Sequence, residues 1–170
     1  MSQFRADEDK VTLSEFFSDK SLRVAGRLDY DSEGLLLLSD NGRFIQKVTH
    51  PRFKLPKTYW AQVEGNVSEV ALARLRDGVN LKDGLTLPAE AQIIAEPENL
   101  WSREPPIRYR ASIPTSWVEL TIGEGRNRQV RRMMAAVGFP VLRLVRSRIG
   151  EWQLGNLLPG QNQDISAAPD

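Results

Sequence analysis

One stretch near the start of the chain, residues 26–38, constrains the fold more than any other. It reads Gly-Arg-Leu-Asp-Tyr-Asp-Ser-Glu-Gly and then four leucines, so three carboxylates and two glycines lie between two apolar segments. This pattern predicts an acidic turn between two buried strands. Because a carboxylate loses hydration energy on burial unless it is paired or faces a cleft, we expect a positively charged partner for this turn elsewhere in the chain.

The composition narrows the chemistry that such a chain can perform. With 170 residues, 41% hydrophobic and 26% charged, it is typical of one soluble globular domain, and no apolar run exceeds five residues. We therefore expect a cytoplasmic protein without a membrane span or signal peptide. Cysteine is absent and His50 is the one histidine, which excludes thiol catalysis and leaves a metal site dependent almost wholly on carboxylates.

Hydrophobic periodicity and turn signals predict an α+β fold with a mostly antiparallel sheet. The helix predicted over residues 68–77 has Ser68 as its N-cap and ends at Gly78. Further helices are predicted over residues 12–17, 43–49 and 126–137. Strands are predicted over residues 22–28, 35–38, 57–65, 89–95, 107–113, 117–123, 141–145 and 151–154.

The predicted helix 126–137 has one apolar face and one basic face. At 100° per residue, three arginines at positions 128, 131 and 132 lie opposite a stripe of valines and methionines, whereas Arg126 lies with the apolar stripe. An inward arginine needs a carboxylate, and Asp29 is the candidate partner. Alternatively, Arg126 precedes the helix and reaches solvent.

A basic block covers residues 126–150, which hold seven arginines and no acidic residue, although the net charge of the chain is only +1. Such a block indicates a face that binds a polyanion through its phosphates. The alternative is an ordinary solvated face.

The acidic turn also imitates a calcium-binding loop, with acids at positions 29, 31, 33 and 40. Leucines fill the seventh to tenth positions of that loop, and no helix of normal length precedes it. Calcium binding is therefore disfavoured.

Three motifs in order resemble those of the RsuA-like ribosomal RNA pseudouridine synthases. They are Gly26–Leu36, Lys57–Tyr59 and Glu124–Met133, and the resemblance extends from Phe4 to about Leu158. The segments 105–108 and 113–117 are most similar to members that act on the large ribosomal subunit. The resemblance implies the pseudouridine synthase fold: a mostly antiparallel mixed sheet in two lobes flanked by helices, with an active-site cleft at the middle.

The resemblance also implies which residues act on RNA. Asp29 would be the catalytic nucleophile or base, Tyr59 would stack on a flipped-out uridine, and Arg126 would pair with Asp29. Arg27 would support extrusion of the base, or else form a surface salt bridge with a neighbouring acid. The expected RNA-binding residues are Arg27, Lys57, Arg128, Arg131, Arg132, Arg143 and Arg146.

We expect residues 1–170 to form a single catalytic domain. Relative to the group, the sequence lacks an N-terminal strand with an Asn-Lys-Pro motif and a small N-terminal RNA-binding domain. The implied reaction isomerises a uridine of 23S ribosomal RNA, is redox-neutral, and requires no cofactor and no metal. The expected partner is large-subunit ribosomal RNA, and the expected state is a monomer. The alternative is a non-catalytic RNA-binding module, which would not need Asp29, Tyr59 and Arg126 together.

Overall fold

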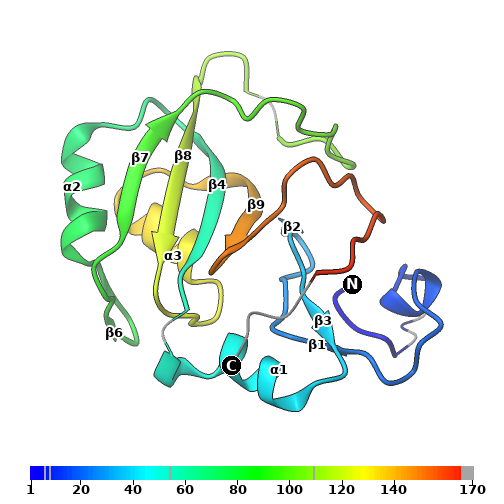
Figure 1. Cartoon of the computed structure of the whole chain (residues 1–170). Coiled ribbons are helices and arrows are strands. Elements are labelled where there is room, and N and C mark those ends of the chain that lie inside the picture. Colours follow the sequence, from blue (N-terminus) through cyan, green and yellow to red (C-terminus); the bar gives the residue numbers. More distant parts are fainter. Residues whose placement is uncertain (6, 8, 54, 109, 166–170) are drawn as a thin grey trace.

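A six-stranded sheet forms the centre of the computed structural model, which describes residues 1–165 except 6, 8, 54 and 109 (Figure 1). Five strands follow one another in the order β10-β9-β4-β8-β7, all antiparallel, and β2 joins β9 in parallel. The α+β fold with a mostly antiparallel sheet is therefore confirmed. The strands are β1 (Arg23–Val24), β2 (Glu33–Gly34), β3 (Leu38–Ser39), β4 (Lys57–Glu64), β5 (Asn80–Leu81), β6 (Gly84–Leu85), β7 (Glu90–Ile94), β8 (Thr115–Ile122), β9 (Val141–Ile149) and β10 (Trp152–Gln153).

Three α-helices flank the sheet: α1 (Gly42–Thr49), α2 (Glu69–Asp77) and α3 (Gln129–Ala136), with short 3₁₀ turns at Leu13–Glu15 and Pro51–Phe53. The ends of α2 match the prediction, because the Ser68 hydroxyl accepts from the Ala71 amide and Gly78 follows the last turn. None of the helices in the described part of the chain is long and apolar enough to cross a membrane.

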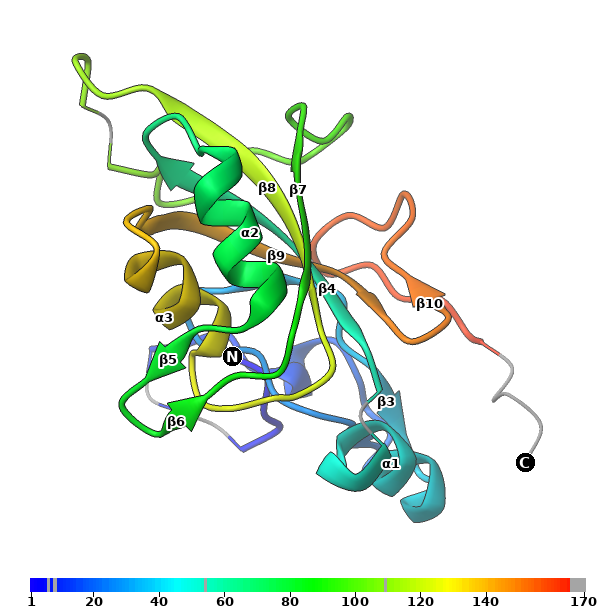
Figure 2. The ribbon, with the colours of Figure 1, turned by 90° about the vertical axis from the view of Figure 1, so that its left-hand side faces the viewer.

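Two hydrophobic clusters form the core. The larger contains alternate residues of β4 and β8 together with the inner faces of α2 and α3, which Figure 2 shows on the same side of the sheet. The smaller joins α1 and the leucines after the acidic turn to the other side of β9. Successive side chains of a strand point to opposite faces of the sheet, so Leu144 of β9 belongs to the first cluster and Val145 to the second. The two clusters therefore lie on opposite faces of the sheet, and the predicted division into two lobes stays a prediction.

Some predicted elements differ from the structure. The described part of residues 107–113 is not a strand. Instead, Ile113 N–H donates to the Arg110 carbonyl and forms a turn before Pro114. Residues 35–37 are irregular, although Leu35 and Leu37 are buried. Leu35 N–H donates to the Arg146 carbonyl, and the Leu37 carbonyl accepts from the Ala25 amide, outside any regular ladder. The hairpin of β5 and β6 was not predicted, and residue 109 lies outside the described residues.

Candidate active site

The acidic turn is held in place by its own backbone and by the start of the chain. Ser32 N–H donates to the Asp29 carbonyl over 3.0 Å. The Ser2 hydroxyl bonds both the carbonyl and the amide of Leu28, at 2.9 and 3.2 Å. With its backbone fixed on both sides, Asp29 keeps a side chain that is 35% exposed. A partly exposed carboxylate on an anchored backbone can reach a substrate without prior rearrangement.

Arg146 of β9 lies buried beside this turn, with 3% of its surface exposed. Its Nε donates to the Leu35 carbonyl over 2.9 Å and its Nη1 to the Arg27 carbonyl over 3.2 Å. Both acceptors belong to the segment that carries Asp29, so the arginine fixes that segment to the sheet. Among the described residues, Nη2 has no hydrogen-bond partner. A buried N–H group without a partner is uncommon, so Nη2 of Arg146 is a candidate donor at this site.

Tyr59 of β4 is directly opposite Arg146 in the antiparallel pair of β4 and β9. Cross-strand neighbours on one face lie close enough to interact. Burial lowers the pKa of Arg146, whereas Tyr59 and Asp29 act on that pKa in the opposite direction. Sequence positions 29, 59 and 146 therefore meet at one site, as expected for 29 and 59.

Two arginines at the start of α3 approach the same turn. Arg128 makes a two-pronged ion pair with Asp31, at 2.9 and 2.8 Å, and its Nη1 lies 3.7 Å from Asp29 Oδ2. Arg131 donates from Nη2 to the Asp31 carbonyl at 2.8 Å and to the Ser32 hydroxyl at 3.4 Å. The Nε of Arg131 is also buried without a partner in the described residues. Arginines 128, 131 and 146 thus surround Asp29.

The electrostatics of the site follow from these contacts. The hydrogen bond from Arg128 lowers the pKa of Asp31, which keeps that carboxylate charged. Burial lowers the pKa of Arg131. Burial and then the charge of Arg146 lower the pKa of Lys57, at the start of β4. The site therefore concentrates positive charge around two carboxylates.

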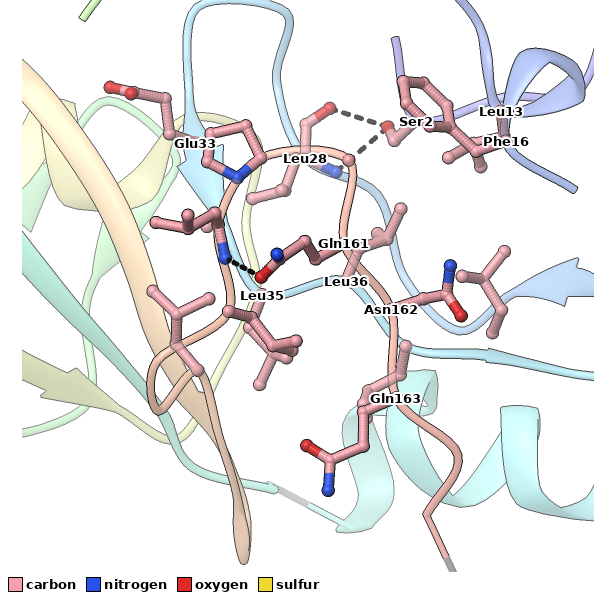
Figure 3. A pocket seen from close by; sticks show the side chains of 18 of the residues that line it. Ser2, Leu13, Phe16, Leu28, Glu33, Leu35, Leu36, Gln161, Asn162 and Gln163 are labelled. Atoms are coloured by element: carbon pink, nitrogen blue, oxygen red, sulfur yellow. Dashed lines mark hydrogen bonds between the residues drawn. The ribbon is translucent and has the colours of Figure 1, made fainter. Parts of the chain in front are cut away.

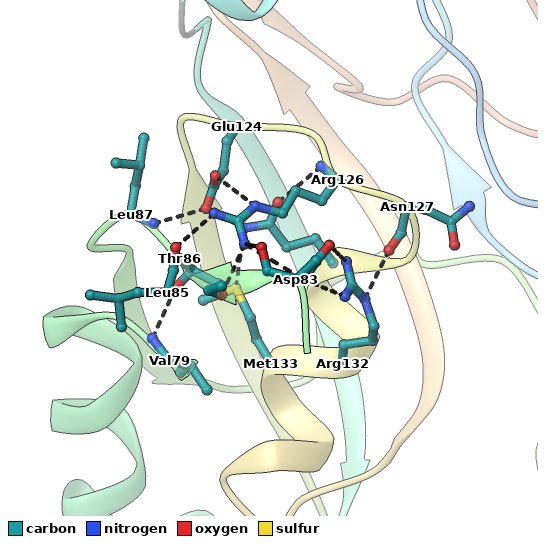
Figure 4. A network of polar contacts seen from close by, with 12 residues as sticks. Val79, Asp83, Leu85, Thr86, Leu87, Glu124, Arg126, Asn127, Arg132 and Met133 are labelled. Atoms are coloured by element: carbon teal, nitrogen blue, oxygen red, sulfur yellow. Dashed lines mark hydrogen bonds and ion pairs between the residues drawn. The ribbon is translucent and has the colours of Figure 1, made fainter. Parts of the chain in front are cut away.

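The predicted pair of Arg126 and Asp29 is wrong. Arg126 instead donates to the carbonyls of Gly84 and Leu85, at 3.0 and 2.7 Å, and to Glu124 at 3.2 Å (Figure 4). The error has a local cause, since α3 begins at Gln129 and not at Arg126, so the helical phase does not apply to Arg126. Arg126 therefore fastens the β5–β6 hairpin.

The predicted RNA-binding residues divide into several environments. Arg132 shares the hairpin with Arg126, because it makes a two-pronged pair with Asp83 at 2.8 and 3.1 Å. Arg143 is only 8% exposed and is paired with Glu33 at 2.9 and 3.0 Å. Its burial and its pair with Glu33 argue against a direct contact with RNA, which stays a prediction. The Arg27 side chain is exposed, and its contact with RNA stays a prediction.

Glu33 connects Arg143 to the long loop between β7 and β8. Its Oε1 also accepts from Trp101 Nε1 over 2.7 Å, while Arg143 Nη2 donates to the Trp101 carbonyl over 2.8 Å. Because Glu33 is on β2, this network holds both the loop and the parallel pair of β2 and β9. Glu33 is therefore a structural carboxylate.

A cavity of about 710 Å³ borders the turn on its apolar side. Asp29 and Tyr30 line one border, and leucines after the turn line much of the wall, with Gln161 and its neighbours across from them (Figure 3). Tyr59 and the three arginines around Asp29 are not among the lining residues. The polar cluster and the cavity are therefore separate features that share Asp29.

Within the described residues, no group of three histidine, aspartate or glutamate side chains is arranged to hold a metal ion. The polar residues of the site are instead carboxylates, arginines, a lysine and a tyrosine. Such a set can act as nucleophile or base and can stabilise negative charge.

Comparisons with known proteins agree with the motifs. A family model described as RNA pseudouridylate synthase matches residues 3–136. The chain is 55% identical over 166 residues to "Ribosomal large subunit pseudouridine synthase E" of Vibrio vulnificus, covering 98% of this chain and 70% of the relative. It is 54% identical over 161 residues to the protein of that name from Xanthomonas axonopodis pv. citri, covering 94% and 85%.

A solved structure titled "Crystal structure of pseudouridylate synthase" matches with a TM-score of 0.77 and 32% identity, covering 94% of this chain and 64% of that one. The family match extends over most of the chain, and it includes Asp29, Tyr59 and the arginines at the start of α3. The chain therefore belongs to the family of RNA pseudouridylate synthases, which are enzymes.

Proposed function

We propose that this chain converts a specific uridine of 23S ribosomal RNA in the large subunit to pseudouridine, with Asp29 as nucleophile or base on a flipped-out nucleotide. The choice of RNA is supported by the relatives at 52–55% identity, which are named for the ribosomal large subunit. The single observation that carries the mechanism is the partly exposed Asp29 between buried arginines whose N–H groups are not all used.

The reaction breaks the bond between ribose C1′ and uracil N1 and forms a bond between C1′ and C5 of the same uracil. Asp29 either attacks C1′ or removes a ribose proton, and the uracil leaves with the electron pair of the broken bond. After the ring turns, C5 bonds C1′ as the bond between Asp29 and C1′ breaks or, on the other route, as the proton taken by Asp29 returns to the ribose, and the proton lost from C5 is replaced by one on N1. Atoms and electrons balance without a further reactant.

Each neighbour of Asp29 has a role that its position supports. Negative charge develops on the departing uracil, and the unpaired Nη2 of Arg146 can donate to a uracil oxygen. The ring of Tyr59 can stack on the extruded base, a contact that contributes about 1 to 3 kcal/mol per base. Extrusion itself costs a few kcal/mol, so stacking is of the size needed to hold the base outside the RNA helix.

The test is to incubate the protein with unmodified 23S ribosomal RNA and to map new pseudouridine by carbodiimide-dependent primer extension. We expect one modified position with the parent protein, none with Asp29→Asn, and parent-like modification with Asp40→Asn. Asp40 is a matched control because it is an exposed acid in the turn between β3 and α1. Unmodified 16S ribosomal RNA serves as the substrate control.

Two results would contradict the proposal. Modification by Asp29→Asn at the parent rate would remove the assigned role of Asp29. Modification of 16S but not 23S RNA would show that the substrate differs from that of the named relatives.

A further inference from the structure

Two carboxylates on the acidic turn compete for one guanidinium group. Arg128 directs both of its terminal nitrogens at Asp31, at 2.9 and 2.8 Å. The nearer of these nitrogens lies 3.7 Å from Asp29 Oδ2, which is beyond hydrogen-bond distance. Asp29 therefore experiences the charge of Arg128 without accepting a hydrogen bond from it.

This difference matters because of the chemistry assigned to Asp29. A carboxylate that accepts a two-pronged hydrogen bond from arginine is strongly stabilised in its charged form. Its oxygens then have less capacity to form a bond to carbon or to accept a proton. A reactive Asp29 needs positive charge nearby together with oxygens that remain open to the substrate, and the observed geometry provides both.

The conformation and exposure of Arg128 show that the ion pair is needed to direct its side chain. Arg128 precedes α3 in a left-handed conformation, with φ of 49°, which is uncommon for a residue other than glycine. Its side chain is 43% exposed and that of Asp31 is 40% exposed. Packing alone does not confine such an exposed side chain, so the ion pair with Asp31 sets its direction.

Arg131 strengthens this interpretation. It holds the carbonyl of Asp31 at 2.8 Å and approaches the Asp31 carboxylate at 3.5 Å. The carboxylate of Asp31 is therefore fixed from the side of the helix. Among the described residues, Asp29 is the other carboxylate within 4.0 Å of the Arg128 guanidinium, so it is the acidic partner that remains when the Asp31 carboxylate is removed.

We propose that Asp31 is a positioning residue that keeps Arg128 from closing on Asp29, so that Asp29 meets the uridine with its oxygens free. This inference rests on the proposed role of Asp29. It assigns to Asp31 a function in the reaction beyond that of shaping the turn.

The experiment compares Asp31→Asn, Arg128→Gln and the double variant in single-turnover pseudouridine formation, with RNA affinity measured separately. Asp31→Asn should slow the reaction roughly 10- to 100-fold, the effect of one charge-assisted hydrogen bond, with little change in affinity. The double variant should recover most of the lost rate, because no guanidinium remains to close on Asp29. Asp31→Glu should stay close to the parent, since a longer carboxylate still binds Arg128.

If the ion pair between Asp31 and Arg128 only stabilises the turn, the double variant should be as slow as Asp31→Asn, because removing the second partner does not restore the lost contact. A double variant as slow as Asp31→Asn would therefore overturn the proposal. If neither Asp31→Asn nor Asp31→Ser yields folded protein by circular dichroism, Asp31 holds the turn and the proposal is likewise overturned.

A readout independent of catalysis separates this inference from the proposed function. In a crystal structure of Asp31→Asn, we expect a terminal nitrogen of Arg128 within hydrogen-bond distance of an Asp29 oxygen. An Arg128 side chain turned toward solvent would overturn the inference even if the parent forms pseudouridine. A parent protein inactive on 23S RNA, with Arg128 closed on Asp29 in the variant, would contradict the proposed function alone.

Discussion

Replacement of Gly34 by alanine tests how closely the catalytic segment must approach the sheet. Gly34 has φ of +106°, and an added Cβ would meet the backbone carbonyl oxygen of Arg146 and lie 2.6 Å from the Arg146 amide nitrogen. Ordinary contact begins at 3.4 Å, so the amide nitrogen alone requires β2 to move away from β9 by about 0.8 Å, and the nearer carbonyl oxygen requires more. The obstructing atoms are backbone and cannot turn aside.

The cost has two parts. A left-handed conformation disfavours alanine by about 1 to 2 kcal/mol. Forcing an extra carbon into a packed contact costs about 1 to 3 kcal/mol. Gly34→Ala should therefore lower the free energy of unfolding by roughly 2 to 5 kcal/mol, against a total of about 5 to 15 kcal/mol for a typical domain.

Catalysis should suffer as well, since the same strand pair places Arg146 against the segment of Asp29. A misplacement of about 1 Å can reduce a rate about 100-fold. The measurements are equilibrium unfolding in urea and single-turnover pseudouridine formation by the folded variant.

Two glycines elsewhere in the chain serve as matched controls. Gly84 has φ of +107° with no atom within 4 Å of the added carbon, so Gly84→Ala has the conformational cost without the clash. Gly42 begins α1 in open space, and Gly42→Ala should be neutral or slightly stabilising. The reasoning is refuted if Gly34→Ala is no less stable than Gly84→Ala and retains the parent rate.

Three further predictions use the same assays. Arg146→Gln should reduce the single-turnover rate by about 100-fold or more. Arg126→Gln should reduce that rate by less than about 10-fold, because the partners of Arg126 lie in the β5–β6 hairpin. Equal losses in the two variants would support a role for Arg126 beside Asp29. Lys57→Met should raise the free energy of unfolding at pH 7, because a lowered pKa means that folding disfavours the charged lysine. This advantage should disappear as the pH rises through that pKa toward 10.5, and urea unfolding at several pH values checks it. The logarithm of the RNA affinity should fall with the logarithm of the salt concentration less steeply than for seven arginines that all bind phosphates. Several of the seven are already paired with Asp31, Asp83 or Glu33 in the protein. A slope near that of seven phosphate contacts would contradict this prediction.

The elements that local signals define were predictable from the sequence. Helices α1 and α2 have side-chain caps from Asn41 and Ser68, and their ends depend on residues within a few positions. Strand β4 shows regular alternation, and its register places Tyr59 where the motif implied a site residue. The composition of the acidic turn indicated that it needs a positive partner, and the resemblance to the family singled out Asp29 among its three carboxylates. In these cases the causes of structure lie close together in the chain.

The arginine that fixes the segment of Asp29 to the sheet could not be predicted in this way. Arg146 was assigned to an exposed basic face because no acid lies near it in sequence, but its principal acceptors are the carbonyls of Arg27 and Leu35. Every residue has a backbone carbonyl, so the sequence does not reveal which one accepts a hydrogen bond from an arginine. One signal was available, since Arg146 alternates with the buried Leu144 on β9 and so shares a face with the core. The predicted helix began three residues too early, at Arg126 instead of Gln129, so the helical phase gave Arg126 the wrong partner.

The basic block is therefore a set of arginines with different tasks, and the acidic turn explains why several are needed. Glu33 forms an ion pair with Arg143 and stabilises the parallel pair of β2 and β9. Asp31 forms ion pairs with Arg128 and, at the longer distance of 3.5 Å, with Arg131. Asp29 alone is left beside positive charge without a direct hydrogen bond from Arg128. Asp31 removes the guanidinium of Arg128 from competition for Asp29, which on the proposal above leaves the Asp29 oxygens open to the uridine, whereas Glu33 and Arg143 act on the strand pair.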